Sequence, residues 1–465
     1  MKKIKYPIWA KTMILLYIVS GLSSCDSFLE VDLPKSQLTS VSVFQNTQTA
    51  NAALMDIYGK LRDNGMLSGT SLGLSQQLAY YTDELDFFGS ATLSNQTFYT
   101  NSLVATSSFV GTIWSTGYSQ IYATNAVIEG IKASSTLSVN DKRQLEGQAL
   151  FLRGLIHFNL VNLFGDIPYA TTTDYNQNKI AKKSKVEEVY NKINVDLKEA
   201  SVLLGDTEFD NLRVRAGKSV VNALLARVNL YNGSWVEAIN RSSAVIAEQG
   251  RFGLESMSNV FLKDSKETIW QLQPAIVGKN TDEAFTFILL NAPSTSVALS
   301  NAFINSFTAN DLRKTSWIGK VSNAAGTVTA NFPFKYKQRV NTATTLEYPI
   351  VMRLSEQYLI RAEAKAQQGD LLGAAQDLNI IRSRVGLANT IATTKEQLIE
   401  AVHQERRWEF FTEHGHRFFD LKRSGRINTV LSAVKPGWNS TDVLFPIPAN
   451  EININPNLLP QNQGY

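Results

Sequence analysis

Apolar side chains recur along much of the chain with the three-to-four-residue spacing of amphipathic helices. Residues 43–64, 113–125 and 186–204 each carry apolar positions at i, i+3, i+4 and i+7, which is the stripe of a helix with one buried face. Residues 144–164 are apolar almost all round, so we expect this helix to lie at the centre of the molecule. The pattern therefore predicts a mostly α-helical fold.

Two stretches look like helix hairpins built to one plan. One helix ends at Gly233 and the other at Gly369, where a left-handed glycine closes the last turn. Ser234 and Asp370 follow at the N-cap position of the next helix. With their small alanines, these hairpins resemble tetratricopeptide helix pairs. No constant period links them to the other helices, so we predict helix pairs with long loop insertions rather than a regular solenoid.

The insertions have a different texture. Residues 90–108 and 254–330 are rich in Ser, Thr, Asn and Gly, with single aromatics between them. Within the second insertion, residues 267–274 favour a short β-strand that places Trp270 in the core. Loops longer than about 15 residues are usually functional or disordered, and the scattered aromatics favour function. The tail, residues 434–465, is rich in Pro and Asn, and we expect it to wrap the surface as ordered coil.

The first 24 residues predict a targeting segment rather than part of the folded body. Residues 1–24 contain four lysines and no acidic residue, and residues 13–19 form an apolar run that is too short to span a bilayer. Residues 22–25 resemble a bacterial lipobox that ends at Cys25, the single cysteine. We predict a signal peptide over residues 1–24 and lipidation of Cys25, which would anchor the protein stably. The alternative is an ordinary signal peptide with an incidental cysteine.

Composition narrows the possible classes of protein. Of the 465 residues, 44% are apolar and 18% are charged, which excludes a dominantly disordered chain. A single cysteine excludes a disulfide framework. After residue 24 the chain carries 41 basic and 41 acidic side chains, because four lysines precede that point. A formally neutral chain offers no global field for holding nucleic acid, so we expect no nucleic-acid partner.

Signals for catalysis and metal binding are weak. Residues 69–73 match a nucleophile elbow around Ser71, but the residues before them are too few and too polar for the buried strand that an elbow needs. Three carboxylates within residues 83–86 suit either paired-carboxylate hydrolysis or a loop that binds hydroxyls or a cation. Three of the four histidines lie in residues 403–416, where a partly buried network of paired Arg and Glu groups is favoured over a metal site. We expect no catalytic residue, no metal and no cofactor.

Several segments, in order along the chain, resemble one family. These segments are Cys25 with the six residues after it, and residues 153–169, 358–364, 378–386, 405–410 with 415–421, and 445–452. Jointly they resemble the SusD/RagB outer-membrane lipoproteins from residue 25 to the end. Val385 replaces the alanine usual in this family, and Phe418 replaces a frequent tryptophan.

The resemblance implies a fold, a place and a partner. It implies a body of about four tetratricopeptide-like helix pairs, with residues 25–235 and 236–465 interwoven into one globular unit. It implies a lipid-anchored protein on the outside of the outer membrane that partners a TonB-dependent, SusC-like transporter. Such proteins are not enzymes, and they deliver glycans or, in some members, peptides. A surface hydrolase or a pure scaffold is the less favoured alternative.

The resemblance does not identify the ligand site, so we take candidates from aromatics in polar loops. Such a ring either stacks on the C–H face of a sugar or anchors its loop to the body. Trp317 is the first candidate, because tryptophan offers the largest flat face and polar residues surround it. The other candidates are Asn310, Asp311 and Arg313 near Trp317, Asp83 with Tyr81, Phe87 and Phe88, and Phe98 with Tyr99.

Overall fold

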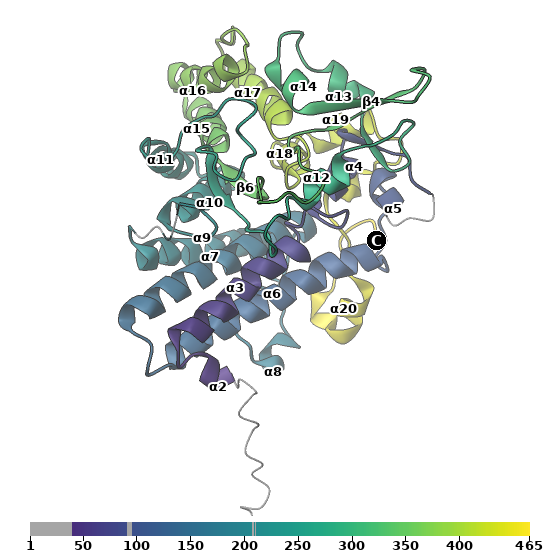
Figure 1. Cartoon of the computed structure of the whole chain (residues 1–465). Coiled ribbons are helices and arrows are strands. Elements are labelled where there is room, and N and C mark those ends of the chain that lie inside the picture. The colour runs from purple at the N-terminus through teal and green to yellow at the C-terminus, as the bar shows by residue number, and fades with distance from the viewer. Residues whose placement is uncertain (1–39, 91–94, 207–208, 210) are drawn as a thin grey trace, which may run out of the picture.

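The computed structural model describes residues 40–90, 95–206, 209 and 211–465 (Figure 1). The predicted signal peptide and Cys25 lie outside the described residues. Helices dominate the described part of the chain, and the strands form three two-stranded sheets. The prediction of a mostly α-helical fold with a small amount of strand is confirmed.

The elements have the following bounds. The longer helices are α3 (Thr47–Asp63), α6 (Ser108–Ala133), α7 (Val139–Phe164), α9 (Val186–Leu204), α10 (Lys218–Tyr231), α11 (Trp235–Ile246), α15 (Leu354–Gln368), α16 (Leu371–Arg384) and α17 (Lys395–Glu409). The shorter ones are α2 (Ser40–Val43), α4 (Leu74–Tyr81), α5 (Asn95–Tyr99), α8 (Tyr175–Asn178), α12 (Asp282–Phe287), α13 (Asn301–Asn305), α14 (Leu312–Ser316), α18 (His416–Arg423), α19 (Ile427–Ser432) and α20 (Ala449–Ile454), with 3-10 turns η2 (Ser440–Val443) and η3 (Pro456–Leu458). The strands are β1 (Leu85–Phe87), β2 (Thr268–Gln271), β3 (Val297–Leu299), β4 (Ile318–Ser322), β5 (Thr329–Pro333) and β6 (Ile350–Arg353).

The long helices pack in sequence order as pairs. α3 packs on α6, α7 on α9, α10 on α11 and α15 on α16, with further contacts from α6 to α7 and from α11 to α15 (Figure 1). α7 is the buried central helix that its all-round apolar pattern predicts. It approaches α9 closely because a glycine faces the partner: a Cβ at Gly154 would meet Cδ2 of Leu197 at 3.0 Å. In Figure 1 the insertions, including α12, α13, α14 and β4, lie above α3, α6, α7 and α9 and to the right of α15 and α16.

The two predicted hairpins are present, with one difference at a cap. Gly369 has a φ of +86° and ends α15, and the Asp370 carboxylate accepts from the Gly373 N–H at 2.9 Å as the first cap of α16. Gly233 also has a positive φ, but the predicted Ser234 side-chain cap is wrong. The N–H of Ser234 is instead held by the Asn232 side-chain oxygen at 3.1 Å, which fixes the turn before α11.

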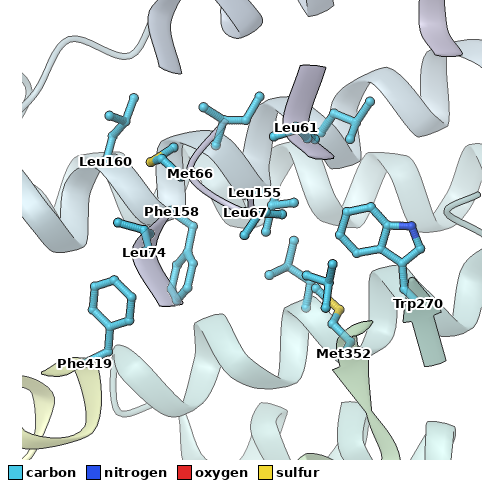
Figure 2. Close-up of a cluster of buried hydrophobic side chains, with 14 of the residues drawn as sticks. Leu61, Met66, Leu67, Leu74, Leu155, Phe158, Leu160, Trp270, Met352 and Phe419 are labelled. Atoms are coloured by element: carbon cyan, nitrogen blue, oxygen red, sulfur yellow. The ribbon is translucent and has the colours of Figure 1, made fainter. Parts of the chain in front are cut away.

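One hydrophobic core runs through the helix stack and into the insertions. Leu61 of α3, Leu155 of α7, Trp270 of β2 and Met352 of β6 come together in it (Figure 2). Trp270 is fully buried, as predicted, and its ring meets Phe151 edge-on at 5.2 Å between centroids. The predicted strand within residues 267–274 is β2, which pairs antiparallel with β6.

The tail after residue 434 contributes to this core as well as wrapping the surface. Phe445 and Ile447 are fully buried, and the N–H of Phe445 donates to the Leu163 carbonyl at 2.8 Å. The prediction of surface coil therefore missed part of its role. Within the described residues no helix is long and apolar enough to cross a membrane.

A buried ionic network joins the helix stack to the insertions. Arg353, at the end of β6, pairs with Glu267 at 2.9 Å, with Glu409 at 2.5 Å and with Glu413 at 2.9 Å. Arg313 of α14 binds the other oxygen of Glu409 at 3.0 Å. These charged groups are almost wholly shielded from solvent. The predicted Arg–Glu network is thus confirmed, and it is larger than the run of residues that suggested it.

The electrostatics of the network favour the ionised form of two of its carboxylates, Glu409 and Glu413. Burial alone would raise the pKa of Glu409, but Arg384, Arg353 and Arg313 outweigh it and hold that pKa well below its usual value. The same balance lowers the pKa of Glu413 beside Arg353.

Among the described residues no cluster of His, Cys, Asp and Glu has the arrangement of a metal site. His414 lies against the Ile350 carbonyl, with Nε2 at 2.9 Å.

We predict that Arg353→Met lowers the free energy of unfolding by about 3–5 kcal/mol, because it leaves buried carboxylates without their cation. Denaturant unfolding at pH 7 measures the change. The matched control is Lys192→Met, which breaks the exposed 2.7 Å pair with Glu188 and should cost less than about 1 kcal/mol. Equal effects from the two substitutions would contradict a structural role for the network.

Candidate functional site

The structure separates the predicted ligand-site aromatics into buried and accessible rings. Trp317 is completely buried, its indole N–H donates to the Met257 carbonyl at 3.0 Å, and its ring packs edge-on against Phe261. Lys335 and Arg353 of the ionic network lie 5.2 Å and 5.6 Å from the ring centroid. The expectation that Trp317 offers an open face to a ligand is wrong, because the ring covers the network's cations.

Two of the three polar neighbours of Trp317 are also buried. Asp311 and Arg313 are buried and bind one another at 2.7 Å, and Arg313 also binds Glu405 at 2.7 Å. Asn310 is exposed on the loop before them. Asp311 and Arg313 therefore do not face solvent as ligand-binding groups would.

Two further candidates are core residues. The Tyr81 ring meets Phe98 and Phe445 edge-on, and its hydroxyl donates to the Asp442 carbonyl at 3.1 Å. Phe98 is fully buried. Asp83 binds Arg407 and Arg417, each at 2.8 Å. Tyr81 and Phe98 anchor their segments to the body, which is the structural role that an aromatic in a polar loop can have. Asp83 anchors its segment through its two salt bridges.

The remaining aromatic candidates are Phe87, Phe88 and Tyr99, the first two at and just after the end of β1. β1 pairs antiparallel with β3, with Phe87 opposite Val297, and the Phe88 N–H continues the ladder to the Ser296 carbonyl at 2.9 Å. Since side chains alternate along a strand, Phe87 and Phe88 point to opposite sides. Phe87 is half-buried and lies 6.3 Å from the Tyr99 ring, whereas Phe88 is 50% exposed.

Two charged groups complete this surface. The Tyr99 hydroxyl donates to Asp86 at 3.4 Å, and burial raises the pKa of Asp86. Lys435 places its ammonium 4.0 Å from the Tyr99 centroid and donates to the Tyr80 carbonyl at 2.7 Å. Burial lowers the pKa of Lys435 to about 8, with Asp86 acting in the opposite direction. We call Asp86, Phe87, Phe88, Tyr99 and Lys435 the loop cluster.

Sequence reasoning missed Lys435, because it lies more than 330 positions away in the tail. Phe88 supplies an accessible ring, and Asp86 and Tyr99 supply a half-buried carboxylate and a phenol next to one another. Such a surface can stack against a flat apolar face and accept hydrogen bonds from hydroxyls. Its neighbours Asp83 and Glu84 are held in the body, and burial raises the pKa of Glu84 to about 7. Neither is placed as an acid–base partner at the loop cluster.

A concave surface lies along α6. A pocket of about 350 Å³ opens there, and we call it the α6 pocket. Its walls come from α6, from the segment before α8, from α8 itself and from the tail: Trp114, Tyr118, Tyr122, Asn125, Pro168, Thr172, Tyr175, Asn178, Lys179, Glu451, Asn455 and Leu458 are among its lining residues. Sequence analysis assigned the α6 aromatics to a buried stripe, yet Tyr122 is 55% exposed.

Comparison with known proteins gives a consistent result. Residues 27–230 match a family described as starch-binding and associating with the outer membrane, and residues 301–465 match the SusD family. SusD-like protein P25 of Formosa agariphila is 23% identical, over 97% of this chain and 99% of its own length.

Solved structures share the fold. A SusD superfamily protein from Bacteroides vulgatus has a TM-score of 0.79 at 21% identity, covering 91% of this chain and 100% of its own. A surface glycan-binding protein A from Bacteroides fluxus has a TM-score of 0.73 at 23% identity, covering 90% of this chain and 100% of its own. At these identities the likeness concerns the fold alone.

We predict that Trp317→Ala lowers the free energy of unfolding by about 3–5 kcal/mol, because it opens a cavity over the buried cations. Phe88→Ala is the matched control: it also removes an aromatic ring from an insertion, and it should change stability by no more than about 0.5 kcal/mol. Thermal and denaturant unfolding of both variants measure the difference. If the Trp317→Ala protein were as stable as the Phe88→Ala protein, the buried indole would not contribute to the stability of the fold.

Proposed function

Because the chain belongs to the SusD/RagB family, we propose that it captures glycans at the cell surface and passes them to a TonB-dependent, SusC-like transporter in the outer membrane. In this proposal the protein is a lipoprotein anchored through Cys25 and facing outward. It binds its ligand and does not cleave it. The family and its carbohydrate-binding members support this assignment.

The loop cluster is the proposed ligand site, and the exposed Phe88 ring is the observation that carries it. A pyranose ring has an apolar C–H face that stacks on an aromatic ring, and its equatorial hydroxyls lie at the rim of that face. Asp86 lies within the same cluster, where its carboxylate can accept hydrogen bonds from those hydroxyls, as it does from the Tyr99 hydroxyl. Lys435 and Phe87 hold the Tyr99 ring from two sides, so the cluster keeps its shape without a ligand.

A peptide ligand is the second candidate within the family. It would need backbone hydrogen-bonding groups along an open strand, or a cavity that encloses its main chain. The aromatic surface with a hydroxyl-accepting carboxylate favours a glycan.

We predict that Phe88→Ala weakens binding of the cognate oligosaccharide by about 1–2 kcal/mol, because the stacking face is lost. Isothermal titration against purified glycans, with a melting curve to verify the fold, measures the effect. Leu72→Ala is the matched control, since Leu72 has a similar exposure of 53% but lies outside the cluster. Unchanged affinity in the Phe88→Ala protein would place the ligand elsewhere.

The proposed anchor gives a separate test in cells. We predict that Cys25→Ala moves the protein out of the outer-membrane fraction, because the acyl chains on Cys25 would supply the stable membrane attachment. The wild-type protein, extracted in detergent, should bring down a barrel-sized transporter from cells grown on the inducing glycan. An unchanged membrane fraction for Cys25→Ala would overturn the lipid anchor, and repeated recovery of the lipoprotein alone would count against the transporter.

A further inference from the structure

The aromatic walls of the α6 pocket are more exposed than a helix stack requires. Among the described residues, four large aromatics are exposed: Phe88, Phe285, Tyr122 and Tyr175. The last two both line the α6 pocket, and Tyr175 is 73% exposed. Behind them Trp114 and Tyr118 form a tilted pair with centroids 4.8 Å apart. A wall of rings with open faces is a surface for flat apolar groups.

The polar frame of the pocket is fixed in advance. The Tyr118 hydroxyl donates to the Pro168 carbonyl at 2.8 Å, and Asn178 donates to the Thr172 carbonyl at 2.9 Å. Asn125 donates to the Ala170 carbonyl at 3.1 Å and accepts from Arg153 at 3.0 Å. These bonds hold the segment before α8 against α6. The pocket therefore keeps its shape without a ligand, which lowers the ordering cost of binding.

One carboxylate in the pocket lacks a cationic partner. Burial raises the pKa of Glu451, a hydrogen bond from Trp114 lowers it, and no cationic group among the described residues enters that balance. Half-buried carboxylates without a cation need hydrogen-bond donors to offset their lost hydration. Lys179 also lines the pocket, with its ammonium bound to the Asn176 side chain at 3.0 Å. One acid and one base leave the lining neutral, which favours a neutral ligand rich in hydroxyls over an organic cation or anion.

The pocket also continues along the surface. A neighbouring cavity of about 490 Å³ is lined by Phe44, Gln45, Glu129 and Thr173, and it shares Tyr122 with the α6 pocket. The Tyr122 ring thus stands where the two hollows meet. A ligand that stacks there can extend to both sides, as a chain of sugar rings does and a single small molecule does not.

We propose that the α6 pocket is a second saccharide-binding site, which takes a neutral oligosaccharide stacked on Tyr122 and hydrogen-bonded to Glu451. This inference rests on the proposed function, since it extends glycan capture to a second place on the same protein. The pocket is lined by residues of α6, α8 and α20. In the view of Figure 1, α8 and α20 lie below α6, whereas α4 and α5, near the loop cluster, lie above it. Two separated sites would hold one glycan chain by two contacts, and linking two binding events raises the overall affinity.

The test uses the mature full chain and a fixed panel of neutral hexasaccharides: β-1,3-gluco-, β-1,4-gluco-, α-1,4-gluco-, β-1,4-xylo- and β-1,4-manno-oligosaccharides. Titration calorimetry compares wild type with Tyr122→Ala, Glu451→Gln and Phe88→Ala. Val195→Ala, at a residue 63% exposed on α9, is the matched surface control. Tyr122→Ala and Glu451→Gln should each weaken one class of sites about tenfold, the loss expected for a stacking ring or a hydrogen bond to a charged group.

A local signal assigns the binding event to the pocket. Trp114 is almost buried at the base of the pocket, so a sugar bound there should change its fluorescence. The change should persist in Phe88→Ala, disappear in Trp114→Phe and weaken in Tyr122→Ala. All variants must retain the wild-type melting profile except Trp114→Phe, which serves only to assign the signal.

The outcomes separate the two proposals. Losses from both Tyr122→Ala and Phe88→Ala, at distinct sites, support two saccharide sites. A loss from Phe88→Ala alone overturns the α6 pocket and leaves the loop cluster standing. A loss from Tyr122→Ala and Glu451→Gln alone supports the pocket and overturns the loop cluster. Failure of the wild-type protein to bind any hexasaccharide, with no change in Trp114 fluorescence, overturns the pocket as a site for neutral sugars.

Discussion

The packing of the insertions on the helix stack depends on one buried guanidinium, that of Arg353. It ends β6 and directly precedes α15, and it binds carboxylates from the residue before β2, from the end of α17 and from the turn after α17. Removing such charges from water costs several kcal/mol per ion, so the network is favourable only when every partner is in place. This all-or-none requirement fixes how segments far apart in sequence come together.

The position of the loop cluster follows from that arrangement. Asp83, just before β1, is held by Arg407 of α17 and Arg417 of α18. This anchor sets where β1 begins, and the strand alternation then decides that Phe87 turns toward Tyr99 while Phe88 remains accessible. A shift of one residue would exchange the two rings. The accessible aromatic surface is therefore determined by salt bridges that do not touch a ligand.

The periodic parts of the fold could be predicted from sequence, whereas the candidate site could be predicted only in part. The helix stripes, the core position of Trp270 and the turn at Gly369 depend on local patterns, and the structure has all three. Trp317 was misjudged because polar neighbours suggested exposure, although Arg313 finds its partner Glu409 96 positions away. No local signal reports such a pairing. The exposure of Tyr122 could not be predicted either, because the apolar stripe of residues 113–125 is wider than the surface that α6 buries.

The carboxylates near the two proposed ligand surfaces are arranged for binding a sugar rather than for hydrolysing one. The acids nearest the loop cluster are committed: Asp83 to two arginines, and Glu84 to the Thr412 N–H at 3.2 Å. Asp86 and Glu451 lie singly, and each accepts a hydrogen bond from an aromatic side chain, Tyr99 and Trp114 respectively. Hydrolysis of a glycosidic bond by the usual route needs two carboxyl groups facing the same bond. A single carboxylate next to a ring suits recognition of a sugar that leaves unchanged, and Asp86 and Glu451 provide this combination at the two surfaces for which glycan binding is proposed.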